Sequence, residues 1–267
     1  MNIKSFLIEL HRRNPVLSIT GWAHLLVLAG AIAGVLLDTR QILGINPWIK
    51  PAKFAISNAA FLWTMGWILE YLAGHLKAAR RISWGIAVAM VFEIVSVSLQ
   101  SFRGIPSHFN FTTPLNSLIF GLMGIFILLN TVLIGYVLFL FFRQTPVRST
   151  AYIWGIRLGL IIFIGSGFIG RAMVEQGSHT VGAEDGGPGM PVMNWSTEAG
   201  DLRVSHAIGL HALQLLPLIG FQVGRSRVSE LRQDTLVWIA SILYAALVLG
   251  VYFQALQGHP FMVIGTQ

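Results

Sequence analysis

The sequence predicts an all-α integral membrane protein, a bundle of seven transmembrane helices. Of its 267 residues, 54% are hydrophobic and only 11% are charged, whereas soluble domains carry about 25% charged residues. The mean hydropathy is +0.68. Seven apolar runs, each long enough to cross a hydrocarbon core about 30 Å thick, are separated by short polar segments. We therefore expect a single transmembrane domain over residues 1–267.

The first four spans are expected at about residues 15–37, 54–74, 83–100 and 115–142. The first run is too long for a signal peptide and lacks its cleavage pattern, so it is read as retained. Before it, the FLIEL segment of residues 1–14 is read as a short amphipathic piece at the membrane interface. A compact basic turn follows the second run, and the polar, turn-rich stretch SFRGIPSHFNFTTP ends the third.

The last three spans are expected at about residues 152–174, 204–224 and 235–256. Five glycines in the fifth run, at positions 155, 159, 165, 167 and 170, favour close helix packing. Residues 175–203 form the longest loop, and a connection of that length is typical of a lid or binding loop. The sequence shows no internal repeat.

The distribution of basic residues predicts the orientation of the chain. Eleven Lys and Arg residues lie on the side of the N-terminus and six on the other side. By the positive-inside bias, the N-terminus is cytoplasmic and the C-terminus is outside, in a membrane of the bacterial inner-membrane type.

The net charge of +7 does not indicate nucleic acid, because the basic residues sit in the short turns where orientation signals belong. With no Cys in the chain, disulfides and thiolate ligands are excluded.

The stretch from Asp201 to Phe221 is apolar enough to cross the bilayer, yet it is polar in its first half. Polar groups in lipid are costly unless they face protein, water or a ligand. At 100° per residue, Arg203, His211 and Gln214 fall on one stripe of the helix, and His206 lies to one side of it.

The third span carries an acid near its middle. Glu93 shares one helix face with Ser96, Gln100 and Ala89, so this face is expected to point into the bundle. A carboxyl at this depth is by default a functional candidate.

Histidines gather toward the predicted outer side, where they would line a polar pocket that opens outward. Haem b is the favoured ligand of this pocket, because neutral imidazoles on facing helices are usual axial ligands and small neighbours admit the macrocycle. His24 and His211 would be the ligands. Arg103, Arg171 or Arg203 would hold the propionates, and Glu93 would carry protons. Such a protein would exchange electrons with a quinone or another amphiphile.

A zinc-dependent membrane enzyme acting on a lipid or another amphiphile is the alternative. Three histidines would bind the metal, and Glu175 or Glu93 would act as general base. The candidate ligands are His108, His179, His206, His211 and His259. The spacing H-x4-H from His206 to His211 differs from the H-x3-H of the seven-pass ceramidase and adiponectin-receptor superfamily, so no family is assigned.

A transporter or sensor is the third interpretation, with Glu93, His24, His211 and Gln214 lining a cavity for a proton or small solute. The lack of an inverted repeat disfavours an alternating-access transporter. The sequence carries no signal for an oligomeric state.

Overall fold

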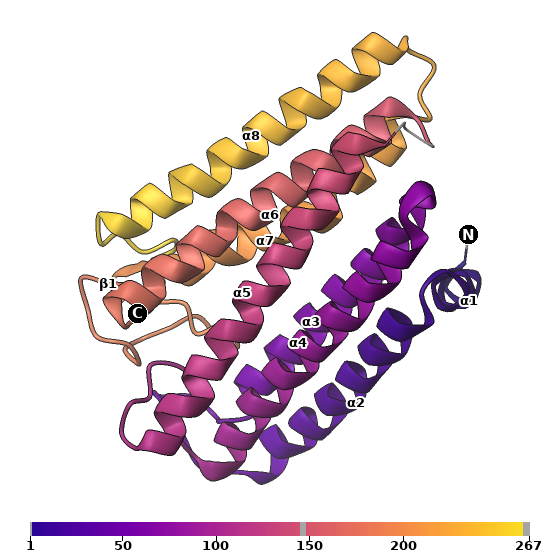
Figure 1. The fold of residues 1–267 in the computed structure, drawn as a ribbon. Coiled ribbons are helices and arrows are strands. Elements are labelled where there is room, and N and C mark those ends of the chain that lie inside the picture. The colour runs from indigo at the N-terminus through magenta and orange to yellow at the C-terminus, as the bar shows by residue number, and fades with distance from the viewer. Residues whose placement is uncertain (1, 145–147, 264–267) are drawn as a thin grey trace. The chain divides into compact units, whose positions relative to one another are not determined.

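The computed structural model describes residues 2–144 and 148–263. Its eight α-helices within these ranges are α1 (Ile3–Arg13), α2 (Pro15–Leu37), α3 (Ile49–Ile68), α4 (Leu76–Arg103), α5 (Pro114–Arg143), α6 (Thr150–Gln176), α7 (Leu202–Val223) and α8 (Glu230–Leu256) (Figure 1). Two short 3-10 turns, Leu69–Tyr71 and Ala73–His75, precede α4. Two short strands, β1 (Thr180–Val181) and β2 (Gly200–Asp201), pair antiparallel between α6 and α7.

Six of these helices, α2 and α4 to α8, are long and apolar enough to cross a membrane. Their bounds match six predicted spans, most closely at Pro15–Leu37. The chain is therefore a polytopic, all-α membrane protein.

The second predicted span, 54–74, was placed too late in the chain. The helix runs from Ile49 to Ile68, because Lys50, Pro51 and Lys53 are tolerated in its first turns although they lower its hydropathy. Helix α3 is not among the six apolar candidates. The seven-span count and the orientation of the termini stay predictions.

The chain divides into two compact units, residues 1–144 and residues 145–267. In the first unit, α2 packs against α3 and α4, and α4 packs against α5 (Figure 1). The loop after α2 lies beside the end of α4 at one end of this unit. There the guanidinium of Arg40, in that loop, donates to the carbonyl of Phe102, in the last turn of α4, at 3.2 Å. At the other end, Gln144 donates to the Tyr71 carbonyl at 2.8 Å.

The amphipathic piece expected at the N-terminus is helix α1. Its apolar side buries Leu10 completely, and the Arg13 guanidinium lies 4.0 Å from the ring centroid of Trp67. Asn14 makes the corner into α2: its side chain accepts from Leu17 N at 3.1 Å and donates to Ser83 Oγ at 2.7 Å. These contacts fix α1 on the end of the first unit.

In the second unit, the most extensive helix contact is between α6 and α7. A methyl group at Gly155 would collide with the Leu216 carbonyl oxygen, and one at Gly159 would lie 2.8 Å from the Ala212 carbonyl oxygen. The prediction of close packing is confirmed at these glycines. At Gly165 and Gly167 a methyl group would meet nothing within 4 Å, so these two glycines make no close helix contact among the described residues.

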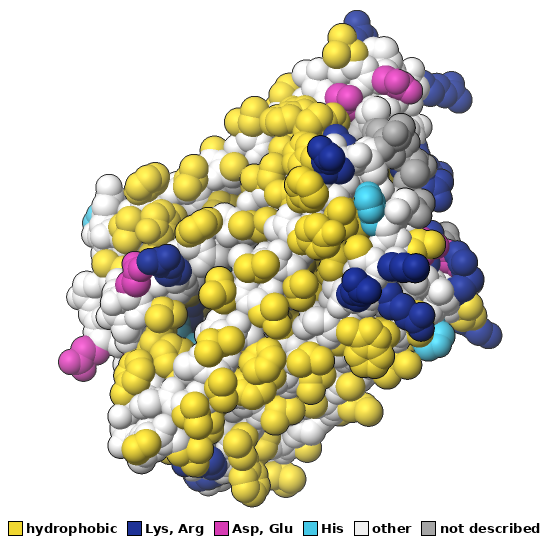
Figure 2. Space-filling model, viewed as in Figure 1, with side chains coloured by type: hydrophobic (Ala, Val, Ile, Leu, Met, Phe, Trp, Pro, Cys, Tyr) yellow, Lys and Arg dark blue, Asp and Glu magenta, His cyan; other side chains and the backbone are white. Residues whose placement is uncertain are grey.

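Figure 2 shows apolar side chains along the visible faces of the helices, with basic side chains gathered toward the α1 end of the first unit. Large exposed side chains on α5 include Ile125, Leu128 and Val132. An apolar exterior of this kind is expected where lipid is the solvent.

The absence of native cysteines allows a direct test of whether α3 crosses the membrane. We expect Gln41→Cys, before α3, and Lys77→Cys, after it, to react with a membrane-impermeant maleimide from opposite sides. In intact cells Gln41→Cys should label and Lys77→Cys should label only after permeabilisation. Labelling of both positions from one side would reduce the number of spans to six.

Candidate functional site

The buried face predicted on the third span is confirmed. Ala89, Glu93, Ser96 and Gln100 are all at most 5% exposed. The Oε2 atom of Glu93 is buried and has no hydrogen-bond partner among the described residues. Helix α4 therefore places a carboxyl group in the interior of the first unit, where at least one of its two oxygens makes no hydrogen bond to the described residues.

His108 approaches this carboxyl group from the loop after α4. Its Nε2 lies 3.9 Å from Glu93 Oε1, and its Nδ1 lies 3.1 Å from Ser107 Oγ. The rings of Phe54 and Phe120 pack around the imidazole, with centroid distances of 5.9 and 5.7 Å. The imidazole thus stands between the polar loop and the buried acid.

A second basic side chain lies near the aromatic rings around His108. Lys50, in the first turn of α3, has its ammonium group 5.9 Å from the ring of Phe54, which packs against the His108 imidazole. An ionised carboxylate in an apolar interior needs a nearby positive charge. A protonated His108, with its Nε2 3.9 Å from Glu93 Oε1, would supply it.

A polar network holds the loop that carries His108. Arg103 donates to Gln100 Oε1 at 2.6 Å and to Asn116 Oδ1 at 2.9 Å. Asn116 donates in turn to Thr112 Oγ1 at 3.0 Å, and Asn110 donates to the Pro106 carbonyl at 2.9 Å. Arg103, predicted as a propionate clamp, is therefore engaged within the protein.

Sequence reasoning missed Lys50, Ser107 and Asn116 as parts of this site. The first two lie at the start of a helix and in a loop, where no periodicity points to a partner. Asn116 gave one usable signal, since it is an amide in the first turn of an otherwise apolar helix.

His24 is buried on α2 and is fixed by main-chain contacts. Its Nδ1 lies 2.8 Å from the Thr20 carbonyl oxygen, and its Nε2 lies 3.2 Å from the Met90 carbonyl oxygen. Carbonyl oxygens only accept hydrogen bonds, and a neutral imidazole carries one N–H, so it donates to one of these two carbonyls at a time. Both ring nitrogens face main-chain carbonyls, and the residue lies between α2 and α4.

In the second unit, Asp185 organises the first part of the long loop. Its carboxylate accepts from His179 N at 3.1 Å, from Thr180 N at 3.0 Å and from Thr180 Oγ1 at 2.8 Å. The Nδ1 of His179 lies 2.6 Å from Asp185 Oδ2. Burial by itself would raise the pKa of Asp185, but the hydrogen bonds from His179 and Thr180 hold that pKa well below its usual range.

Two arginine–acid pairs are present in the second unit. Arg203 pairs with Asp201, which is buried and also accepts from Ser196 N at 2.9 Å. Arg171 pairs with Glu175 at 2.7 Å, and both side chains are largely exposed. These guanidinium groups have partners within the chain.

The remaining predicted histidines lie at separate places in the second unit. The Nδ1 of His206 lies 2.7 Å from the Ser166 carbonyl oxygen, against Gly170. His211 is exposed, and its Nδ1 lies 3.3 Å from Gln214 Oε1. His259 is exposed after the end of α8.

Within residues 2–144 and 148–263, no group of three or more His, Asp or Glu side chains stands close enough to hold a metal ion. Of the predicted zinc ligands, His108 belongs to the first unit and the other four belong to the second. His24 and His211, the predicted haem ligands, are divided between the units in the same way.

No known protein family, curated protein or solved structure matches this chain.

We expect Asp185→Asn to loosen the long loop, because the charged acceptor of two main-chain N–H groups is lost. Hydrogen bonds to a charged group contribute about 2 kcal/mol, so the amides of His179 and Thr180 should exchange with deuterium about thirtyfold faster. The matched control is Glu184→Gln, an exposed neighbour, which should leave exchange unchanged. Equal protection in all three proteins would show that the carboxylate does not hold the loop.

The same contact predicts a pH dependence. A depressed pKa in the folded state means that the stabilising contribution of Asp185 is complete above its unfolded pKa of about 3.9. It is lost progressively as the pH falls below that value toward the folded pKa. We expect the contribution of Asp185 to the stability of the loop to stay constant between about pH 5 and 8. Near pH 3 the wild type should lose part of the protection of its His179 and Thr180 amides against exchange. The Asp185→Asn variant should show no such additional loss when its amide exchange is compared with that of the wild type.

Proposed function

We propose that the first unit contains a proton-exchange site in which His108 passes protons between the loop after α4 and the buried carboxyl group of Glu93. The observation that supports it is the approach of an imidazole to one oxygen of an intramembrane acid whose other oxygen is unsatisfied. In the predicted orientation this loop faces outward. The function of the protein would then be proton-linked transport or sensing.

The geometry suits a gated transfer. Direct proton transfer needs donor and acceptor within about 3.2 Å, and the His108–Glu93 distance is 3.9 Å. A single side-chain adjustment or one bridging water closes this gap. The proton leaves His108 Nε2 and joins Glu93 Oε1, so that the imidazolium becomes neutral and the carboxylate becomes a neutral acid.

The transfer does not change the net charge of the two side chains. Before it, the two side chains form an ion pair in a medium of low dielectric constant, and after it both are neutral. Transfer to the neutral pair removes both charges from the apolar interior, which lowers the desolvation cost of the site.

A pH-jump infrared experiment on the purified protein tests the site. The wild type should show a carboxylic acid band from a buried group that gains and loses its proton, and Glu93→Gln should lack the band. His108→Gln should keep the band but slow its protonation by at least about a hundredfold, the usual effect of removing a positioned acid or base.

The matched control is Glu175→Gln, which removes an exposed acid paired with Arg171. It should leave the band and its rate unchanged. If Glu93→Gln retains the band, Glu93 is not the proton acceptor. If the carboxyl group in His108→Gln is protonated as fast as in the wild type, His108 is not its relay.

Haem b ligation is the second candidate, and the orientation of His211 favours it. The Nδ1 of His211 lies 3.3 Å from Gln214 Oε1. In the tautomer that carries its proton on Nδ1, that oxygen accepts the hydrogen bond and Nε2 keeps its lone pair for a metal, as in a metal-ligating imidazole whose other nitrogen is held. His24 would have to give up its contact with the Met90 carbonyl to bind iron. Zinc chemistry with Glu175 as base has no comparable support and stays a prediction.

The visible spectrum of protein from cells supplied with a haem precursor decides this candidate. Under haem ligation, a Soret band with sharp reduced α and β bands should be present, and His211→Ala should abolish it. His179→Ala should leave the spectrum intact, since that imidazole is committed to Asp185. A colourless wild-type protein would rule out haem ligation. Elemental analysis of the same sample would then measure its zinc content.

A further inference from the structure

Three basic side chains at the start of α4 are left without a partner in the chain. Lys77, Arg80 and Arg81 are exposed, and none of them makes an ion pair or a hydrogen bond with the residues that the structure describes. Arg13 of the same unit, by contrast, pairs with Glu9 at 2.7 Å. The start of α4 therefore presents three uncompensated positive charges.

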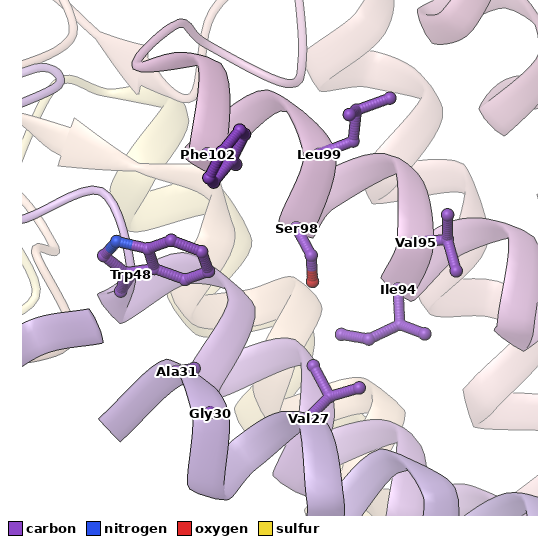
Figure 3. Close-up of a pocket in the computed structure, with 9 residues that line it drawn as sticks. All are labelled: Val27, Gly30, Ala31, Trp48, Ile94, Val95, Ser98, Leu99 and Phe102. Atoms are coloured by element: carbon purple, nitrogen blue, oxygen red, sulfur yellow. The ribbon is translucent and has the colours of Figure 1, made fainter. Parts of the chain in front are cut away.

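A hollow of about 510 Å³ opens beside two of these charges. The residues that line it are Gly74, His75, Leu76, Lys77, Ala78 and Arg81. Lysine and arginine side chains make strong, charge-assisted hydrogen bonds to phosphate oxygens. The groove between α2 and α4 is different, since none of the nine residues that line it is charged (Figure 3). The hollow, and not the groove, can select a charged group.

The exposed face of α4 continues from these charges as an apolar surface. At 100° per residue, three apolar residues fall within about 40° of the direction of Lys77 around the helix axis. They are Trp84, Val88 and Val91, which are 57%, 51% and 42% exposed. The rest of the chain therefore leaves about half of this face uncovered.

The order of residues along this face matches one leaflet of a membrane. Helix α4 is long and apolar enough to cross a bilayer, so its basic start lies at the level of the headgroups. Trp84 follows at the depth where tryptophan is enriched in membrane proteins. From Arg81 to Val91 the helix rises about 15 Å, which is half of a hydrocarbon core about 30 Å thick.

We propose that the start of α4 binds a phospholipid whose headgroup carries a net negative charge. Lys77 and Arg81 hold its phosphate in the hollow, and its acyl chains lie along Trp84 and the two valines. Charge complementarity supports this occupant, because a zwitterionic headgroup brings a cation of its own to three unpaired cations. A soluble phosphate ion would leave the apolar part of the face uncovered.

The lipid site shares no residue with the proton-exchange site. Glu93→Gln and His108→Gln should therefore bind the anionic lipid as the wild type does. A failure of the lipid site would leave the proton-exchange site standing, and the reverse also holds.

The test measures which lipid surrounds α4 in phosphatidylcholine bilayers that contain the full chain. Brominated phosphatidylglycerol or brominated phosphatidylcholine is added in increasing amounts, since bromine quenches tryptophan emission on contact. We expect the anionic lipid to quench more strongly at equal mole fraction, and Trp84→Phe to remove most of this excess. Arg81→Gln should lower the relative binding constant about fivefold, the effect of one basic residue at an anionic surface. Lys77→Gln, Arg80→Gln and Arg81→Gln combined should abolish the excess.

The matched control combines Arg225→Gln, Arg227→Gln and Arg232→Gln, which removes the same charge from exposed positions of the second unit. It should keep the excess quenching. Equal loss in both triple variants would overturn the proposal, because net charge would then set the lipid preference. Equal quenching by the two lipids in the wild type, or an excess that survives in Trp84→Phe, would overturn it as well. So would loss of the excess in millimolar inorganic phosphate, since the hollow would then be a site for a soluble anion.

Discussion

Hydrocarbon offers no partner to a polar group, and the structure of both units follows from this constraint. Several hydroxyl groups on the spans turn back to a carbonyl in their own helix, as at Ser166 and Ser241. The His24 imidazole faces the carbonyls of two helices. A few buried side-chain atoms have no partner among the described residues, including Ser18 Oγ, Ser98 Oγ and Glu93 Oε2. Unmet hydrogen-bonding capacity inside a membrane protein is costly, and the proposed proton-exchange site is built on the Glu93 carboxyl group.

Charged residues near the helix ends serve mainly to build the loops. Asp185 and Asp201 accept main-chain N–H groups and a neighbouring basic side chain. Arg103 draws Gln100 and Asn116 together beneath the loop that carries His108. An arginine at a membrane surface is therefore weak support for a bound anion when an acceptor lies in the same loop. These hydrogen bonds lie beside the loop after α4, which places an imidazole 3.9 Å from a buried acid.

Patterns with a fixed period were read correctly from the sequence. The buried face of α4 follows from residues three and four apart. His108 gave no such signal, since loop residues have no period. His211 was placed at the centre of a pocket, yet it is exposed, because a helical stripe identifies neighbours on one helix but not what covers them. The start of α3 was missed because its first turns are polar.

The sequence alone determined an all-α membrane protein, because span length and hydropathy are local properties and the helical repeat fixes which residues share a face. Tertiary structure decided the partners of those faces. His24 meets Met90 across 66 positions of the chain, and His108 meets Glu93 from a loop. An apolar groove likewise brings together α2, α4 and Trp48, the residue before α3. Such contacts depend on how helices pack, and packing is set by the fit of whole surfaces, which no single stretch of sequence encodes.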